Sequence, residues 1–506
     1  MTTDTVSQST HATVQRFLST PVGMLIGGRR VEATSGNWFD SIDPATGSRL
    51  TSVALGDPAD VDRAVTAAHA AFDDPSWQRL APLDRGRLLH RLADLIEEHA
   101  DELALLESYD NGKPLSVARA VDVGTSAKLF RYFAGWPSKY EGATIPVSPR
   151  GGLDVLNYTT HEPIGVVGAI VPWNFPMSMA VWKLAPALAT GNTVVLKPAE
   201  ETSLSTLRLV ELIHEAGFPP GVVNVVTGPG ATVGAAIAAH PGIGKVAFTG
   251  STAVGRAVAI AATGNLKKVS LELGGKSPNI VLPDADPDTV AAAAAEAIFF
   301  NQGQTCTAGS RLYVHADLYD EVLSGVVDRA RRIVVGPGTD PATEMGPLVS
   351  AKQHKTVCGY VESGRAEGGR VAAGGGRPAT LASEYAGGFF VEPTVIEAPD
   401  DGLTVVQEEI FGPVLTVLRW HETDDLIRRA NASPYGLAAG IWTRDLTSAH
   451  TLARAIRAGT IWINCYNLTD PASPFGGYKE SGWGREMGRA ALDLYTETKS
   501  VWVNLG

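Results

Sequence analysis

The stretch that decides the fold is GVVGAIVPWNFP at residues 165–176, in which an unbroken apolar run ends at Val171 and Pro172 follows. Further short apolar runs lie at residues 193–197, 222–226, 245–248 and 268–273. Longer segments of helical character separate most of them. Continuous apolar strands that alternate with helices are typical of a parallel sheet covered on both faces. Residues 164–274 are therefore predicted to belong to a Rossmann-like α/β domain.

The rest of the chain predicts a second α/β region and two strands that stand apart. Strands of the second region are expected near residues 311–315, 414–420, 436–442 and 460–464. Residues 145–163 and 496–505 each contain strand-like alternation. Nearer the N-terminus, helices are expected from Asp57, where an N-cap precedes a proline, and from Leu83 and Asp101. Residues 1–20 are predicted to be a mobile tail.

Composition narrows the functional classes. A chain of 506 residues is long for one domain, so two or three are expected. The formal net charge of −12 argues against a nucleic-acid groove. No apolar stretch reaches the length of a transmembrane helix, and the polar N-terminus lacks a signal core. Three cysteines are too few for a disulfide scaffold and suit a reducing cytoplasm, so a cytoplasmic protein without membrane or nucleic-acid partners is expected.

Three segments carry residues that can act together on a carbonyl group. Cys306 follows the polar, glycine-containing residues 301–305 at the end of a long apolar helix. A free cysteine is more often a small buried hydrophobe, but this context favours a nucleophile. Glu272 lies in an apolar strand before two glycines, where partial burial would raise its pKa and suit a general base. Asn174 can be read as a turn former, or as an amide that stabilises an oxyanion.

Two glycine-containing segments could hold a dinucleotide. Residues 228–234 space their glycines as GxGxxxG, which does not fit the common fingerprint and is more easily explained as a plain strand-to-helix turn. Residues 248–255 give a stronger signal, because they follow a predicted strand and open a helix. The N–H groups and the dipole at such a helix start suit a pyrophosphate.

These patterns together resemble the aldehyde dehydrogenase superfamily, NAD(P)-dependent enzymes that oxidise aldehydes to acids. The resemblance runs from about residue 20 to the C-terminus, and it implies an NAD-binding domain at residues 21–144 and 164–274. It implies a catalytic domain at residues 275–480 and a small β oligomerisation arm at residues 145–163 and 481–506, which would build a homotetramer as a dimer of dimers. It also implies a Cys306 thiohemiacetal and thioester, an oxyanion hole from Asn174 and the Cys306 N–H, deacylation by Glu272, and no metal.

The resemblance also assigns individual residues of this chain to the cofactor site. Lys197 and Glu200 resemble the residues that hold the adenosine ribose, although an exposed pair at a strand end would look the same. Glu409 resembles the ligand of the nicotinamide ribose, and Phe411 resembles the ring packed on nicotinamide, although it could equally be core. The full cofactor set implied is Ile170, Pro172, Trp173, Lys197, Glu200, Gly230, Gly234, Phe248, Gly250, Ser251, Val254, Leu273, Gln353, Glu409 and Phe411. The acids at 200 and 201 predict NAD rather than NADP.

The resemblance also implies a substrate tunnel with an aromatic wall and an open one. Its lining is expected to be Thr125, Phe175, Ser178, Met179, Trp182, Phe300, Thr305, Leu468, Thr469 and Phe475. Thr125, Ser178 and Thr469 are smaller than the apolar groups of many small-aldehyde enzymes. No aromatic residue stands at Thr469, as the betaine-aldehyde subgroup would have, and residues 477–488 most resemble phenylacetaldehyde-type dehydrogenases. Aryl or arylalkyl aldehydes are therefore the predicted substrates.

Other interpretations remain open at this point. A broad aliphatic aldehyde dehydrogenase would share every motif. A CoA-acylating semialdehyde dehydrogenase typically lacks the general base, so Glu272 argues against it. A cysteine hydrolase would need a Cys–His pair, and no histidine adjoins Cys306 in the sequence. A non-catalytic relative is disfavoured because Cys306, Glu272 and Asn174 are all retained. One departure, Thr356 in place of a common lysine, puts a single cofactor contact in doubt.

Overall fold

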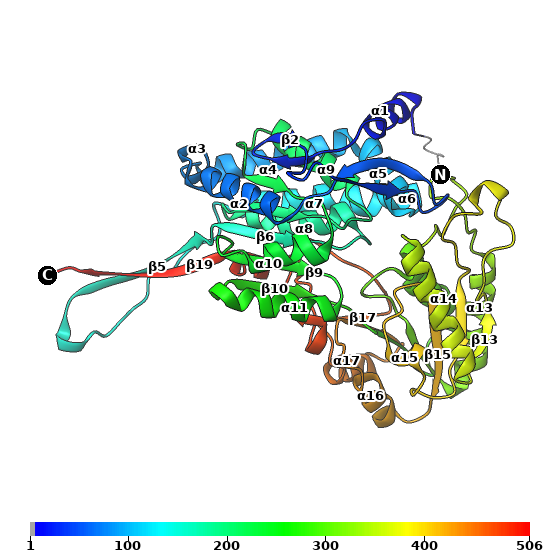
Figure 1. The fold of residues 1–506 in the computed structure, drawn as a ribbon. Helices are drawn as coiled ribbons and strands as arrows, with labels where there is room; N and C mark the ends of the chain where they lie inside the picture. Colours follow the sequence, from blue (N-terminus) through cyan, green and yellow to red (C-terminus); the bar gives the residue numbers. More distant parts are fainter. Residues whose placement is uncertain (1–5) are drawn as a thin grey trace.

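The computed structural model describes residues 6–506 and has two α/β halves with a long two-stranded arm projecting from one of them (Figure 1). Within residues 6–506 the first half contains a sheet of eight strands. In spatial order these are β18 (Gly482–Trp483), β10 (Lys268–Glu272), β9 (Lys245–Thr249), β6 (Val166–Ile170), β7 (Thr193–Lys197), β8 (Val223–Val225), β1 (Met24–Ile26) and β2 (Arg29–Val31). The five central strands from β10 to β8 run parallel. They are the five strands expected from the apolar runs, so that prediction is confirmed.

The continuous apolar character of β6 follows from burial on both faces. Val167 and Ala169 join one core, whereas Val166 and Ile170 join the other. The helices on the first face are α4 (Pro82–Glu98), α5 (Ala100–Asn111), α7 (Gly124–Ala134), α8 (Pro176–Ala189) and α9 (Leu204–Glu215). The helices on the second face are α2 (Pro58–Asp73), α10 (Ala235–Ala239) and α11 (Thr252–Ala262). Alternate residues of one strand thus face two apolar layers, which leaves no position for a polar side chain.

The predicted start of α2 is a complete capping box. The Asp57 carboxylate accepts hydrogen bonds from the N–H groups of Ala59 and Asp60, and the Asp60 carboxylate accepts one from the N–H of Asp57. Pro58 occupies the first turn, where its missing N–H costs nothing. The helices expected from Leu83 and Asp101 are also present, as α4 and α5.

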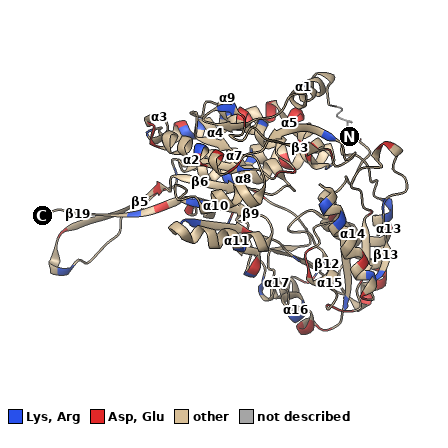
Figure 2. Ribbon diagram, viewed as in Figure 1, with Lys and Arg blue, Asp and Glu red and all other residues tan. Residues whose placement is uncertain are grey.

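The second half holds a seven-stranded sheet, again counted within the described chain. Its order is β13 (Arg370–Ala373), β14 (Thr394–Glu397), β15 (Val414–Trp420), β12 (Arg311–His315), β11 (Pro278–Val281), β16 (Ala438–Trp442) and β17 (Thr460–Ile463). All neighbours pair in parallel except β13 with β14. Helices α12 (Pro287–Phe299) and α13 (Tyr319–Arg332) cover one face, and α14 (Ala351–Ala366), α15 (Thr404–Gln407), α16 (Thr423–Asn431) and α17 (Leu446–Ala455) cover the other. Acidic and basic residues are interspersed on these outer helices (Figure 2).

The arm consists of β5 (Val155–Pro163) and β19 (Thr496–Asn504), paired antiparallel along their whole length. The two strand signals that stand apart in the sequence therefore pair with each other. The arm extends away from the body (Figure 1), and Leu156, Trp502 and Val503 on it are exposed. Strands β3 (Trp38–Ile42) and β4 (Arg49–Ala54) form a further small sheet. None of the helices in residues 6–506 combines the length and hydropathy that crossing a bilayer requires.

Two expectations about the chain ends need correction. Residues 8–18 of the predicted tail form helix α1 (Gln8–Leu18), because Val14 and Leu18 are buried in the first core; residues 1–5 lie outside the described chain. The arm also begins later than residue 481. Strand β18 joins the first sheet beside β10, and Leu492 and Tyr495, at and just beyond the short helix α18 (Ala490–Asp493), are buried in the first core. Local polarity predicted neither contact, because each depends on a partner distant in sequence.

Candidate active site

A cavity of about 1230 Å³ lies at the carboxyl ends of β6, β7, β9 and β10 and reaches across to the second half. Ligands of open α/β sheets bind at this edge, where the loops that follow parallel strands converge. The cavity is lined by every residue predicted for catalysis, cofactor and substrate, from Thr125 and Ile170 to Thr469 and Phe475. The structure therefore brings the three predicted sets together. Their individual roles stay predictions.

The loop that carries Cys306 leaves helix α12 through a left-handed turn. Asn301, Gln302 and Gly303 have φ values of 49°, 58° and 68°. A Cβ at Gly303 would collide with the backbone carbonyl of Gly412, so only glycine fits that position. Three successive left-handed residues reverse the chain abruptly after the helix. This reversal places Cys306 at the cavity instead of extending the helix.

The surroundings of Cys306 favour the neutral thiol. Burial raises the pKa of Cys306 to about 12, and the nearby carboxylates of Glu409 and Glu272 add to this effect. A thiolate is the reactive form of cysteine. The group therefore needs a neighbour that accepts its proton when it attacks.

Glu272 ends strand β10 and is 4% exposed. Neither of its carboxylate oxygens makes a hydrogen bond to the described residues. Burial raises the pKa of Glu272 well above its usual range, and the Glu486 carboxylate raises it further, while Lys183 and Arg485 oppose the shift. A buried carboxylate with a raised pKa is a stronger base than a solvated one, so this position fits a group that takes a proton from water.

Lys183 and Glu486 form a buried pair that the sequence analysis missed. Lys183 Nζ lies 2.6 Å from Glu486 Oε1 and donates a hydrogen bond of 2.7 Å to the hydroxyl of Thr249. A signal was present in the sequence, because Lys183 is the only charged residue in the apolar segment 176–189. A lysine in the middle of an apolar helix needs a buried partner.

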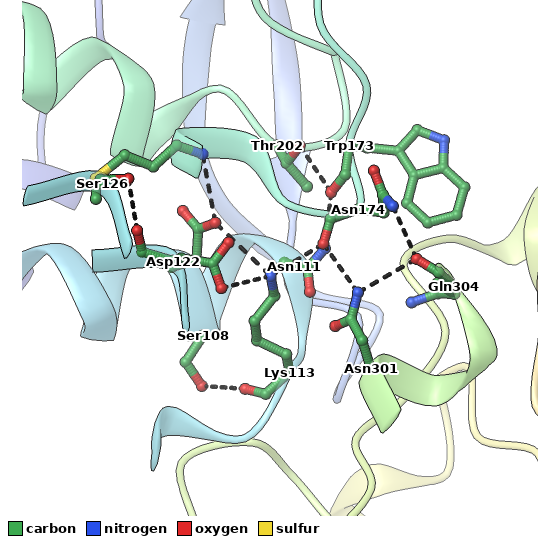
Figure 3. Close-up of polar contacts among 12 residues, drawn as sticks. Ser108, Asn111, Lys113, Asp122, Ser126, Trp173, Asn174, Thr202, Asn301 and Gln304 are labelled. Atoms are coloured by element: carbon green, nitrogen blue, oxygen red, sulfur yellow. Dashed lines mark hydrogen bonds and ion pairs between the residues drawn. The ribbon is translucent and has the colours of Figure 1, made fainter. Parts of the chain in front are cut away.

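Asn174 occupies the loop after β6 and is 4% exposed. Its Nδ2 donates one hydrogen bond, 2.9 Å long, to the backbone carbonyl of Gln304 (Figure 3). An amide nitrogen carries two protons, so a second N–H remains for an acceptor in the cavity. The neighbouring loop also carries Cys306, which puts amide and thiol on adjoining walls of the cavity. This arrangement fits the predicted oxyanion donor.

The far end of the cavity fits a dinucleotide. Lys197 is buried at the end of β7, and its Nζ lies 2.9 Å from the half-exposed carboxylate of Glu200. The pair is therefore anchored, which excludes the alternative of two solvated residues. The N–H of Gly230 lies 3.5 Å from the same carboxylate. Helix α11 begins beside the cavity with Ser251 as its N-cap, an arrangement that suits a phosphate group.

Two of the residues expected near nicotinamide, Glu409 and Phe411, belong to the second half. Glu409 Oε1 accepts a hydrogen bond of 2.8 Å from the N–H of Gly275, and burial raises the pKa of Glu409 to about 7. Phe411 has a left-handed φ of 56° and lies edge-on to Trp173, with ring centroids 5.1 Å apart. Gln353 contacts the same segment, since its Nε2 donates hydrogen bonds to the carbonyls of Ile410 and Phe411 at 3.1 and 2.8 Å. Thr356 lines the cavity, as does Lys352 one helical turn earlier.

Two pairs of aromatic rings lie at the end of the cavity where the substrate is predicted to bind. The rings of Phe175 and Phe300 are stacked with centroids 6.1 Å apart, and those of Trp182 and Phe475 meet edge to face at 5.2 Å. Thr469 is exposed at the edge of the cavity, whereas Ser178, from the same predicted open side, is buried. Lining residues that the sequence analysis did not name include Val121, Glu296, Tyr466 and Asn467. Their segments carry no motif, so only the folded chain identifies them.

Fold and site together define an α/β oxidoreductase whose two halves enclose a cleft that contains a cysteine. The sequence model of the aldehyde dehydrogenase family matches residues 31–501, and the chain belongs to this family. It is 52% identical over 476 residues to mitochondrial aldehyde dehydrogenase of Rattus norvegicus, covering 94% of this chain and 90% of the relative. It is 49% identical over 487 residues to phenylacetaldehyde dehydrogenase of Pseudomonas fluorescens, covering 96% of each. An NAD+ complex structure of aldehyde dehydrogenase from Bacillus cereus matches with a TM-score of 0.94 and 49% identity over 99% of each chain.

Proposed function

We propose that this protein oxidises an aldehyde to the carboxylic acid with NAD+ as the oxidant. The observation that carries the proposal is that Cys306, Glu272 and Asn174 line one cavity, which also extends to Lys197 and Glu200. A nucleophile, a base and an oxyanion donor are the groups that acyl transfer through a thioester requires. NAD+, when bound, supplies the acceptor for the hydride that leaves the aldehyde carbon.

Each step of the proposed reaction takes place at a particular atom of Cys306, Asn174 or Glu272. The Cys306 thiol loses its proton to a water molecule as Sγ bonds to the aldehyde carbon, and the Cys306 N–H and Asn174 Nδ2 donate to the oxygen, which becomes negative. Once hydride has left that carbon, its oxygen reforms a carbonyl and the acyl group remains as a thioester on Cys306. Glu272 takes a proton from water, and the oxygen of that water bonds to the acyl carbon. The carbon–sulfur bond then breaks and the sulfur takes the proton held by Glu272, which releases the acid and restores the thiol and the carboxylate.

Lys197 and Glu200 support NAD as the cofactor. Burial would raise the pKa of Glu200, but the Lys197 ammonium and the backbone N–H groups of Glu200 and Gly230 together outweigh burial, and the pKa is lowered. The carboxylate is therefore ionised at neutral pH and can accept hydrogen bonds from the hydroxyls of a ribose. A 2′-phosphate in the same position would meet a like charge. The similar enzyme from Bacillus cereus forms an NAD+ complex.

The aromatic walls support an aryl or arylalkyl aldehyde as the substrate. Phe175 with Phe300 and Trp182 with Phe475 offer faces and edges on which a ring can pack. The similarity to a phenylacetaldehyde dehydrogenase agrees with this choice. A broad aliphatic aldehyde dehydrogenase is the second candidate, because the open side at Thr469 sets no lower limit on substrate size. Retention of Glu272 disfavours a CoA-acylating reaction.

Assembly and location complete the proposal. The exposed apolar residues on β5 and β19 support an arm that pairs with other copies, and we expect a homotetramer. Three free cysteines support a reducing compartment such as the cytoplasm.

The test is NADH absorbance with a panel of aldehydes, with and without CoA, for the wild type and Cys306→Ala. We expect turnover without CoA, an acid product and complete loss of activity in Cys306→Ala. Cys358→Ala is the matched control, because its thiol is also free but does not line the cavity. Sustained NADH formation by folded Cys306→Ala protein would refute the covalent mechanism. A strict requirement for CoA would replace hydrolysis with acyl transfer to CoA.

A further inference from the structure

A fully buried ion pair contacts the loop that carries Asn174. Lys113 follows helix α5, and its Nζ lies 2.9 Å from Asp122 Oδ2 and 3.8 Å from Glu107 Oε1. Lys113 and Asp122 are both 0% exposed, and neither lines the cavity. Removing two charges from water is unfavourable, and apolar residues of similar volume would often serve packing as well. The pair therefore calls for an explanation beyond filling space.

The ammonium has a third partner, the backbone carbonyl of Asn174. Lys113 Nζ donates a hydrogen bond of 2.9 Å to this oxygen, and Asn301 Nδ2 donates a second one of 3.0 Å (Figure 3). A carbonyl oxygen has two lone pairs, so these two donors satisfy it completely. One donor belongs to the first half of the molecule and the other to the loop that leads to Cys306.

Asn174 and Asn301 are also linked through the backbone carbonyl of Gln304. Asn174 Nδ2 and Asn301 Nδ2 both donate to the carbonyl of Gln304, at 2.9 and 3.3 Å. The backbone and the side chain of Asn174 are thus both tied to the loop that carries Cys306. Asn111, at the end of α5, donates a hydrogen bond of 2.8 Å from Nδ2 to the preceding carbonyl, that of Trp173. With both peptide groups anchored, the direction in which the Asn174 side chain leaves the backbone is set.

Charge and ring contacts agree with a positioning role. Burial raises the pKa of Glu107 well above its usual range, as does the neighbouring Asp122 carboxylate, while the Lys113 ammonium opposes the shift. Of the two carboxylates, that of Asp122 is nearer to the ammonium, at 2.9 Å against 3.8 Å, and it accepts the hydrogen bond. Lys113 Nζ also lies 4.4 Å from the ring centroid of Phe175, a cation–π distance. One ammonium thereby contacts both the residue that bears the oxyanion donor and the aromatic residue next to it.

We propose that Lys113, oriented by Asp122, and Asn301 are positioning residues that hold the Asn174 amide in place to stabilise the oxyanion. This inference rests on the proposed function, because it assigns no chemistry of its own. Oxyanion stabilisation depends on donors that are fixed before the reaction, and a misplacement of about 1 Å can cost roughly a hundredfold in rate. Two independent donors to the Asn174 carbonyl restrict the position of the loop that bears the Asn174 amide.

The test is a double-mutant cycle between Lys113→Met and Asn174→Ala. The measured quantity is the rate constant of the first turnover of NADH formation at saturating aldehyde and NAD+, obtained by rapid mixing. We expect Asn174→Ala to lower it roughly 100- to 1000-fold and Lys113→Met to lower it at least about tenfold. If Lys113 acts only through the Asn174 amide, the double variant should be no slower than Asn174→Ala within about twofold. An additive double variant, or Lys113→Met within about twofold of wild type, would overturn the inference.

Lys479→Met is the matched control. Its ammonium also donates to two backbone carbonyls, those of Asn431 and Ser433, each at 2.8 Å, but it lies outside the cavity. We expect its first-turnover rate to stay within about twofold of wild type. NAD+ binding, followed by protein fluorescence, should be unchanged in both lysine variants. A loss of NAD+ binding in Lys113→Met alone would indicate a general structural role and overturn the assignment.

A second variant covers the case in which Lys113→Met fails to fold. Asn301→Gly removes the other donor without leaving a buried charge, and glycine keeps the left-handed φ at that position. Its cycle with Asn174→Ala should be equally non-additive, and an additive result would count against the inference in the same way. Failure of the proposed function is recognised separately, because Asn174→Ala would then retain the wild-type rate or Cys306→Ala would still form NADH.

Discussion

The ammonium of Lys183 lies 2.6 Å from Glu486 Oε1, and both side chains are buried although 303 residues separate them in the sequence. The two charges act in opposite directions on a third group. The Glu486 carboxylate raises the pKa of Glu272, whereas the Lys183 ammonium lowers it. The proposed base is therefore tuned by a pair of residues as well as by its own burial.

Glu486→Gln should shift the pH dependence of deacylation to lower pH. Burial still raises the pKa of Glu272 in this variant, but the added effect of the Glu486 carboxylate is gone while Lys183 remains. The pKa of Glu272 therefore falls, and the ionised base is present at more acidic pH. The acidic limb of the deacylation rate, measured from the approach to steady state, should move accordingly. The Lys183 ammonium would also lose its carboxylate partner, so the free energy of unfolding measured in urea should fall by about 3–5 kcal/mol.

The control for that measurement is Glu480→Gln, which removes an exposed carboxylate in the same segment, paired with Arg256. Its pH profile should match wild type. An acidic limb that stays in place in Glu486→Gln, or moves to higher pH, would contradict the assignment of Glu272 as the base.

Glu272→Gln should form the acyl enzyme and then stall. The amide has the shape of the carboxylate but cannot take a proton from water, so one equivalent of NADH should appear in a burst with little turnover afterwards. Rapid quenching followed by mass spectrometry should detect the thioester on Cys306. Wild-type turnover would refute the role in deacylation. The absence of both burst and adduct would instead show that Glu272 accepts the proton of the Cys306 thiol.

Glu200→Ser should narrow the preference for NAD over NADP. The wild type should favour NAD by at least about tenfold in kcat/KM, which corresponds to about 1.4 kcal/mol, because the Glu200 carboxylate repels a 2′-phosphate. Serine removes the charge and keeps a hydroxyl. The KM for the aldehyde at saturating cofactor should change little. An NADP kcat/KM equal to that for NAD in the wild-type protein would overturn this prediction.

Thr469→Trp should penalise large aldehydes more than small ones. The exposed Thr469 borders the mouth of the cavity, where an indole would occupy the space open to a phenyl ring. In the wild type, phenylacetaldehyde should exceed acetaldehyde in kcat/KM, since each buried methylene contributes roughly 0.8 kcal/mol. The variant should reduce that ratio about tenfold, a loss of about 1.4 kcal/mol. Acetaldehyde matching phenylacetaldehyde and benzaldehyde in the wild type would exclude an arylalkyl specificity.

Trp502→Lys should weaken the expected tetramer. Trp502 is 57% exposed on β19, next to the exposed Val503, and a charge there would oppose the apolar contact between copies. Light scattering after size-exclusion chromatography should show a smaller species at low micromolar concentration. Lys499→Ala, on the same strand and in an exposed ion pair with Glu162, is the control and should leave the mass unchanged. An unchanged mass in Trp502→Lys would place the interface elsewhere.

The sequence by itself determined the strands and the chemistry they carry. The apolar runs near residues 166, 193, 223, 245 and 268 became parallel strands because both faces of each strand are covered, so most of its positions are apolar, a property visible in any short window. The segments that bear Cys306, Glu272 and Asn174 are also local. Their backbone requirements, such as the left-handed Gly303 before Cys306, are met within a few residues.

Only the tertiary structure decided how those residues are tuned and held. Lys183 and Glu486 are far apart in the chain, as are Lys113 and the Asn174 carbonyl, and no local pattern pairs them. The same reason explains helix α1, which packs on the first core despite its polar sequence, and β18, which adds to the first sheet instead of the arm. A charge or a carbonyl acquires its partner only when loops from both halves close around the cavity. Burial then makes each contact strong, because the low local dielectric magnifies a charge that water would screen.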